Sequence, residues 1–168
     1  MERFGQEVSF IDGLRVTSSE NLKVAEMVLS GTINKVIITQ LKTFGGTAEG
    51  VSGKDGLLIE ARKKQHDGGV DLGYVGEIES VNPELLLVLL KQGFLPVVSP
   101  IGLGKDGTTY NINADTTASR IAVSLHAYKI IFMTDVDGVL VHGKLRGQLS
   151  ANEAENLIKQ NVISGGMA

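Results

Sequence analysis

The sequence predicts an α/β fold, an open three-layer αβα sandwich with a largely parallel central sheet. Segments with strand-type patterns alternate with segments of helical periodicity along the chain, which is the pattern of sheets covered by helices. The expected helices begin at capping sequences, and several end at glycine. The chain has 168 residues, of which 42% are hydrophobic, so it can form one domain with its own core. We therefore expect a single domain over residues 1–168.

The first half of the chain should begin with two short strands followed by a helix. Asp12-Gly13 is a dipeptide typical of type I′ turns, and it lies between two apolar stretches. The expected elements are a hairpin over residues 7–17, a helix from the Thr-Ser-Ser-Glu capping box at 17–20 to Gly31, a segment at 35–44 that fits either a helix or a strand, and a strand over 47–53.

The second half continues the alternation. Asn82-Pro83-Glu84 supplies a cap, a proline for the first helical position and an acidic first turn. The expected elements are a strand over 74–81, a helix over 84–93, a strand over 94–100, a helix over 114–127, a buried strand over 129–134, and a helix over 151–160 that starts at the capping box Ser150-x-x-Glu153.

Composition excludes several classes of function. Sixteen Lys and Arg are interspersed with 19 Asp and Glu, and the net charge is −3, so no basic face for nucleic acid is expected. No apolar run approaches the ~20 residues of a membrane span. Cysteine is absent, which excludes disulfides and thiolate chemistry, and the three histidines lack metal-ligand spacing. We expect a cytoplasmic protein that binds neither nucleic acid nor membranes.

Two glycine-containing motifs resemble phosphate-binding loops but lack features that such loops require. G-x-G-x-x-G at residues 102–107 is followed by Thr and Tyr, which favour strands rather than the helix that a dinucleotide site requires, so a turn at Asp106-Gly107 is expected. "SGKDG" has Ala48 and Asp55 where a Walker A loop needs glycine and a hydroxyl residue, so it too is predicted to be a turn.

The segment "NINAD" at residues 111–115 is a better candidate for a site. Asn113 can cap the helix that follows, and Asp115 falls in its first turn. Asn111 lies beside them at the edge of the predicted sheet, where ligands of open α/β sheets bind. Three short polar side chains there can align a ligand and a cation, so we expect a functional role beyond capping.

The segment "KIIFMTDVDG" is also compatible with a different class of enzyme, a phosphatase. A buried strand followed by D-x-D-G is similar to the first motif of haloacid-dehalogenase-type phosphatases, in which Asp135 would attack phosphorus and Asp137 would act as acid and base. In that family the motif lies near the start of the domain. Only 30 residues follow Gly138 here, without a paired-Asp metal motif, so this remains the weaker alternative.

A series of motifs in order carries a wider resemblance. The series is "FIDGLRVT", "SGKDG", "GYVGEIESVNPELL", "GFLPVVSPIG", "YNINAD", "TDVDGV" and "VISGGM". Over about Phe10 to Ala168 the chain resembles the amino acid kinase family, and within it the enzymes that phosphorylate N-acetyl-L-glutamate. The resemblance implies that family's αβα sandwich and a phosphotransferase that uses ATP with Mg²⁺ on a γ-carboxylate, the second step of arginine biosynthesis.

The resemblance also assigns roles to residues. Arg15 matches an arginine that clamps the substrate α-carboxylate, Asn111 matches an asparagine that binds the acetamido and carboxylate region, and Asp115 matches an aspartate that organises catalytic lysines. It implies a substrate hairpin at about residues 7–17 and a nucleotide-binding part at about residues 116–168. The matched nucleotide-binding residues are Asp135, Val136, Asp137, Gly138, Val139, Leu140, Val162, Ile163 and Ser164.

The departures from the family pattern lie at both ends. Family members carry a lysine-glycine strand and an H-G-G-G strand before the hairpin, and a catalytic lysine shortly after "ISGGM"; none of these is in residues 1–168. We therefore expect a truncated core with little activity alone, and an oligomer of at least two chains. Two alternatives stay open: a non-catalytic substrate- or nucleotide-binding protein of the same fold, and a kinase for a related acyl-amino acid or carbamate.

Overall fold

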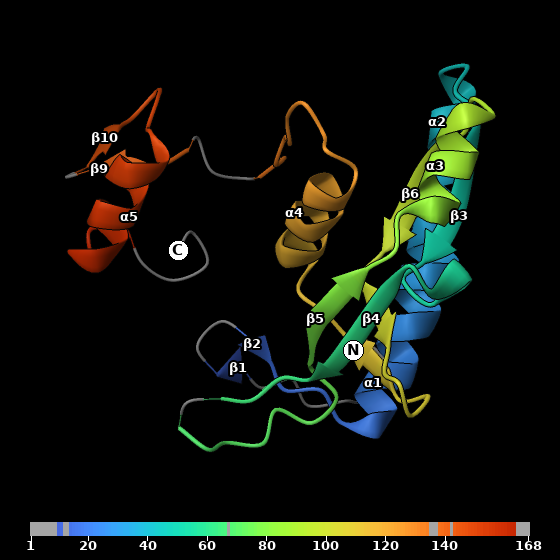
Figure 1. The fold of residues 1–168 in the computed structure, drawn as a ribbon, viewed down its shortest axis with the longest axis horizontal. Helices are drawn as coiled ribbons and strands as arrows, with labels where there is room; N and C mark the ends of the chain where they lie inside the picture. Colours follow the sequence, from blue (N-terminus) through green and yellow to red (C-terminus); the bar gives the residue numbers. More distant parts are fainter. Residues whose placement is uncertain (1–9, 12–13, 67, 135–137, 142, 164–168) are drawn as a thin grey trace. The chain divides into compact units, whose positions relative to one another are not determined.

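The structure is a computed structural model that describes residues 10–11, 14–66, 68–134, 138–141 and 143–163 (Figure 1). The chain forms two compact units, residues 1–130 and 131–168. The first unit opens with an antiparallel pair, β1 (Phe10–Ile11) and β2 (Leu14–Arg15), as the hairpin prediction required. The turn at residues 12–13 lies outside the described residues.

Two parallel strand pairs organise the first unit. β3 (Ala48–Ser52) pairs with β6 (Leu95–Ser99), and β4 (Ile59–Lys63) pairs with β7 (Ile101–Leu103). The second pair is extended on both sides by antiparallel strands. β5 (Gly76–Val81) pairs with β4, and β8 (Thr109–Asn111) pairs with β7, which gives the order β5-β4-β7-β8. The expected α/β class with open sheets is confirmed.

A long helical segment packs on one face of the β3–β6 pair. It runs without a break through α1 (Ser19–Glu26), the π-helical turn η2 (Met27–Ile33) and α2 (Asn34–Thr43). The predicted end at Gly31 is wrong. A glycine inside a helix costs only about 1 kcal/mol, and polar bonds from Ser30 and Asn34 to β6 fix the segment across it. The ambiguous segment at 35–44 is thereby a helix.

The opposite faces of β6 contact different helices, which confirms the three layers. Ser99 Oγ lies 2.7 Å from Ser30 Oγ of η2. Val98, which points to the other face, packs against the core cluster that contains Leu86 of α3 (Glu84–Lys91). In the neighbouring strand, Gly50 faces α2 so closely that an added Cβ would overlap Asn34 Oδ1.

The core of the first unit lies between the four-stranded sheet and its helices. Its buried residues are Leu58, Ile59, Ala61, Ile78, Leu86, Tyr110 and Ile112. Helix α4 (Ala114–Ser124) adds Ile121, and Leu125 follows at its end. Each large apolar side chain buried in this way contributes about 1.5–3 kcal/mol, so the cluster holds β4, β5, β8, α3 and α4 together.

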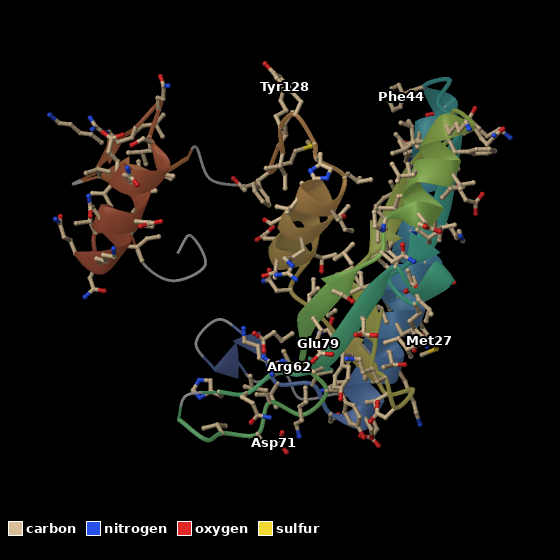
Figure 2. All side chains as sticks on the ribbon, in the orientation of Figure 1. Met27, Phe44, Arg62, Asp71, Glu79 and Tyr128 are labelled. Carbon is tan, nitrogen blue, oxygen red and sulfur yellow. The ribbon has the colours of Figure 1, made fainter. Side chains whose placement is uncertain are left out.

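The predicted buried strand at residues 129–134 does not form. These residues have no regular structure, and Ile131 and Met133 are 75% and 95% exposed. Figure 2 labels the neighbouring Tyr128, whose side chain is also exposed. A β-strand is stable only when a neighbouring strand pairs with its backbone, and no described residue does so here.

The described residues of the second unit form a short hairpin and a helix. β9 (Leu140–Val141) and β10 (Lys144–Leu145) pair antiparallel around Gly143, which has a φ of 75°. The helix α5 (Ala151–Lys159) begins with the expected capping box, because Ser150 Oγ accepts from Glu153 N and the Glu153 carboxylate accepts from Ser150 N at 2.8 Å. Among the described residues, no helix is long and apolar enough to cross a membrane.

We predict that Gly50→Ala lowers the free energy of unfolding by about 1–3 kcal/mol, because the new methyl group has no space against Asn34. Gly31→Ala is the matched control, since a Cβ there meets nothing within 4 Å. Urea unfolding followed by circular dichroism compares the two variants. Equal stability of both would contradict the close approach at Gly50.

Candidate functional site

The glycine-rich motif at residues 102–107 is the turn of a β-hairpin. β7 and β8 pair antiparallel on either side of it, and Gly107 has a φ of 82°. Gly104 N donates to Thr108 O at 2.7 Å, and Asp106 Oδ1 accepts from Thr108 N at 3.0 Å. The expected turn is confirmed, so the glycines position β8 and its last residue, Asn111.

Asn111 is fixed by two other parts of the chain. Its backbone N–H donates to Tyr74 O at 2.9 Å, and its Nδ2 lies 3.4 Å from Thr17 Oγ1. Thr17 is fully buried directly before Ser18, the N-cap of α1. Asn111 is itself half-buried, so part of its side chain remains accessible to a ligand.

Two polar residues at the start of the helix after Asn111 have different roles, one as a cap and one as a candidate catalytic residue. Asn113 is the N-cap of α4, and its Oδ1 accepts from Thr116 N at 2.9 Å. Asp115 lies in the first turn of the same helix and is exposed. The helix dipole stabilises a carboxylate at this position. The structure therefore assigns capping to Asn113 and leaves the Asp115 carboxylate available to accept hydrogen bonds from a cationic group.

The "SGKDG" segment is a tight turn, as predicted, and its lysine is paired. The Asp55 carboxylate accepts from Ser52 N at 2.7 Å. Lys54 Nζ donates to Glu26 Oε1 at 2.9 Å and to Thr109 Oγ1 at 3.1 Å. Lys54 thus links α1 to β8, on the same strand as Asn111. The sequence pattern indicated the turn but not this ion pair, because Glu26 lies 28 positions away.

The structure places only the backbone of Arg15, the predicted carboxylate clamp. It lies in β2 and pairs with Phe10 of β1. Arg15 precedes Thr17, the residue that contacts Asn111, by two positions in the sequence. Arg15 and Asn111 therefore lie on chain segments that meet at Thr17, although they are far apart in the sequence.

The residues predicted to bind a nucleotide all belong to the second unit. Asp135, Val136, Asp137 and Ser164 lie outside the described residues. Gly138 has a φ of 135°, Val139 O accepts from Arg146 N at 2.9 Å, and Leu140 begins β9. Val162 and Ile163 follow α5, where both backbone N–H groups donate to Leu157 O, and Ile163 is buried. These residues therefore belong to a different unit from Arg15, Asn111 and Asp115.

Charged pairs join residues of β4, β5 and the β7–β8 turn. Arg62 lies 3.0 Å from Glu77 and 3.9 Å from Glu79 (Figure 2), and Lys105 lies within 3.3 Å of both Glu60 and Glu79. An open pocket of about 480 Å³ lies beside them, lined by β4, β5 and the β7–β8 hairpin. Lys105, the lysine among its described lining residues, is paired with these carboxylates, so these residues present no free cation to an anionic ligand.

Another ion pair joins the end of β4 to the loop between β4 and β5. Lys63 Nζ lies 2.8 Å from Asp71 Oδ1, and Gly73 N donates to the same carboxylate at 2.7 Å. The hydrogen bond from Lys63 lowers the pKa of Asp71 from its usual 3.8, and it raises the pKa of Lys63 in turn. Asp71 lies two residues from Gly73, so this pair supports the loop that holds Thr17.

No cluster of three acidic or histidine side chains suited to a metal ion occurs among the residues that the structure describes. The isolated Asp115 carboxylate does not make such a set. The described part of the chain therefore offers no site made of protein ligands alone for a Mg²⁺ ion.

A family profile and individual known proteins both match nearly the whole chain. A sequence profile described as "Amino acid kinase family" matches residues 1–168. An acetylglutamate kinase of Halothermothrix orenii is 49% identical over 99% of this chain and 59% of its own length. One from Methanothrix thermoacetophila is 45% identical over 99% of this chain and 61% of its own length. The chain thus spans about 60% of the length of these curated relatives.

Two solved structures share the fold. The smu.665 protein of Streptococcus mutans superposes with a TM-score of 0.87 at 30% identity, covering 99% of this chain and 67% of that one. N-acetylglutamate synthase of Neisseria gonorrhoeae, complexed with coenzyme A and N-acetyl-glutamate, gives a TM-score of 0.80 at 30% identity, covering 94% of this chain and 36% of the synthase.

The Asp71 pair predicts a pH dependence of stability. Because folding lowers the pKa of Asp71, its stabilising contribution is present above the usual value of 3.8 and is lost as the pH falls through the lowered pKa. Asp71→Asn should therefore lose less stability than the wild type between about pH 5 and pH 2.

Urea unfolding at several pH values measures this difference. Lys63→Met and the Lys63→Met/Asp71→Asn double variant complete the thermodynamic cycle, in which the substitution at Asp71 should matter less once Lys63 is absent. An identical acid response of wild type and Asp71→Asn would show that the ion pair has no role in stability.

Proposed function

The chain belongs to the amino acid kinase family, and we propose that it is the core of an acetylglutamate kinase. The reaction is transfer of the γ-phosphoryl group of ATP to the γ-carboxylate of N-acetyl-L-glutamate, which gives N-acetyl-L-glutamyl 5-phosphate. The observation that carries the proposal is the 42–49% identity, over nearly the whole chain, to curated relatives named acetylglutamate kinase. We further propose a cytoplasmic enzyme that acts as an oligomer of at least two chains.

Binding of the acceptor needs groups that recognise a carboxylate and an acetamide. We assign the α-carboxylate to Arg15, because a planar guanidinium donates two parallel hydrogen bonds to a carboxylate. We assign the acetamido region to Asn111, whose half-buried amide can both donate and accept. The meeting of their chain segments at Thr17 supports one common substrate site.

Phosphoryl transfer depends on positioning and on neutralising the charge of the moving group. Asp115 is exposed at the start of α4, and Asn113 fixes that helix start by capping it. A carboxylate held there can accept hydrogen bonds from lysine side chains and orient them toward the transferred group. Asp115 would act as an organiser and would form no covalent bond itself.

We assign the nucleotide to the second unit. The proposed contacts are the segment from Asp135 to Leu140 and the segment from Val162 to Ser164, with ATP as the phosphoryl donor; Mg²⁺ would accompany its phosphates. Membership of the amino acid kinase family over residues 1–168 favours this role for the D-x-D-G motif over a phosphatase nucleophile.

A second candidate is a non-catalytic domain that binds acetylglutamate. The likeness to the N-acetylglutamate synthase that was solved with N-acetyl-glutamate favours it, since only part of that synthase shares this fold. Formation of hydroxamate from N-acetyl-L-glutamate, ATP and hydroxylamine separates the two candidates. The protein expressed from its complete gene should form hydroxamate as a kinase, and ligand binding without hydroxamate would favour the second candidate.

We predict that Asn111→Ala and Arg15→Ala each raise the KM for N-acetyl-L-glutamate about tenfold or more, with smaller changes in kcat, because both remove binding contacts. Asn113→Ala is the matched control. Loss of its cap should cost about 1 kcal/mol of stability and leave KM near the wild-type value. Wild-type KM values in both test variants would remove these two residues from the substrate site.

We predict that Asp115→Asn lowers kcat by about 10²–10³, the usual cost of losing one preorganised electrostatic contact, while KM changes little. Asp106→Asn serves as the control, since Asp106 is an exposed turn residue bonded to Thr108. The hydroxamate assay measures both variants. Wild-type turnover by Asp115→Asn would overturn its role as organiser.

A further inference from the structure

We propose that Thr17 is a positioning residue that fixes the orientation of the Asn111 amide and thereby selects ligands that carry an amide N–H. The proposal rests on the substrate site described above and goes beyond it, because Thr17 itself need not touch the ligand. The capping-box pattern predicted Thr17 as the N-cap of the following helix, which is wrong, because the N-cap is Ser18.

Thr17 is enclosed by a loop from a distant part of the chain. Its backbone N–H donates to Leu72 O at 3.1 Å, and its carbonyl accepts from Tyr74 N at 2.7 Å. Gly73, between these two contacts, has a φ of 68°, and a Cβ there would overlap Thr17 O. Two backbone bonds and full burial therefore leave Thr17 little freedom to move.

The same loop holds Asn111. Tyr74 O accepts from Asn111 N at 2.9 Å, and Asn111 Nδ2 lies 3.4 Å from Thr17 Oγ1. Thr17, Tyr74 and Asn111 thus form a closed circuit that joins three chain segments. The side-chain bond is long, but the backbones of both residues are fixed by shorter bonds, so the Thr17 hydroxyl stays beside the Asn111 amide.

This circuit orients the amide. With its nitrogen donating to the Thr17 hydroxyl, the planar amide of Asn111 has a defined oxygen end, and Oδ1 is an acceptor. N-acetyl-L-glutamate carries a single amide N–H, which is a matching donor. If Oδ1 accepts from that N–H, a ligand without it leaves an unsatisfied acceptor in a half-buried site, which is costly.

The Thr17 hydroxyl is not required for the helix that follows. Ser18 is the N-cap of α1, and its own Oγ accepts from Asn21 N at 3.1 Å. Replacing the Thr17 hydroxyl therefore removes the contact to Asn111 while the cap of α1 remains. This separation allows the positioning role to be tested without disrupting the helix start.

The test compares two ligands by calorimetry, using the protein expressed from its complete gene. N-acetyl-L-glutamate carries the N–H, and 2-acetoxyglutarate of the same configuration replaces it with an ester oxygen. The wild type should prefer the amide about tenfold or more. Thr17→Val, of nearly the same size, should bind N-acetyl-L-glutamate more weakly and reduce the preference to about threefold or less. Thr17→Ser should keep the preference.

Thr109→Val is the matched control. Thr109 lies two residues before Asn111 in β8, and its hydroxyl contacts Lys54 instead of Asn111. Its loss should leave the amide preference at the wild-type value. If Thr17→Val does not fold, Thr17→Ala gives the same test with less bulk against the 72–74 loop.

An unchanged amide preference in the folded Thr17 variant overturns the positioning role and leaves the kinase proposal intact. An equal loss of preference in Thr109→Val also overturns it, because the effect would then be general to β8. Failure of the wild type to bind N-acetyl-L-glutamate overturns both this inference and the proposed function.

Discussion

The parallel pairing of β3 with β6 and of β4 with β7 is the constraint on which the first unit depends. Pro100 has no N–H to donate and separates β6 from β7. Gly53 N donates to Ser99 O at 3.3 Å and extends the β3–β6 pairing, and Gly53 O accepts from Ile59 N at 2.7 Å, which connects this pair to β4. Helices pack on both faces of this double pair, so its register determines which side chains enter the core. The hairpins that carry β5 and β8 extend from it.

Polar contacts fix the helices to these strands as specifically as apolar packing does. Asn34 Nδ2 donates to Val97 O at 2.8 Å, and Lys54 connects α1 with β8. Gly50 provides the space that Asn34 requires. Buried polar groups are costly unless they are bonded, so such contacts disfavour other alignments of helix and strand. The same contacts explain why a helix continues through Gly31.

The candidate substrate site uses this rigid support. Asn111 ends β8, and Asp115 lies in the first turn of α4, so a short stretch of chain carries both the proposed binding residue and the proposed organising residue. Thr17 and the loop around Gly73 add contacts from distant parts of the sequence. A kinase that works by positioning requires such preorganisation, because displacements of about 1 Å change rates substantially. The residues proposed to bind the nucleotide belong to a second unit, whose described residues form a hairpin and a capped helix.

The sequence by itself determined those elements that depend on a few neighbouring residues, such as helix caps, turns and alternating strands. These include the capping box at Ser150, the cap at Asn113, the turn at Asp106-Gly107 and the alternating strand β5, along with the motifs that indicate the family. Only tertiary structure decided the rest. The helix through Gly31 depends on bonds to β6, residues 129–134 lack a strand partner among the described residues, and Thr17 contacts Asn111 across 94 positions. Such contacts leave no local pattern, because their partners become neighbours only when the chain folds.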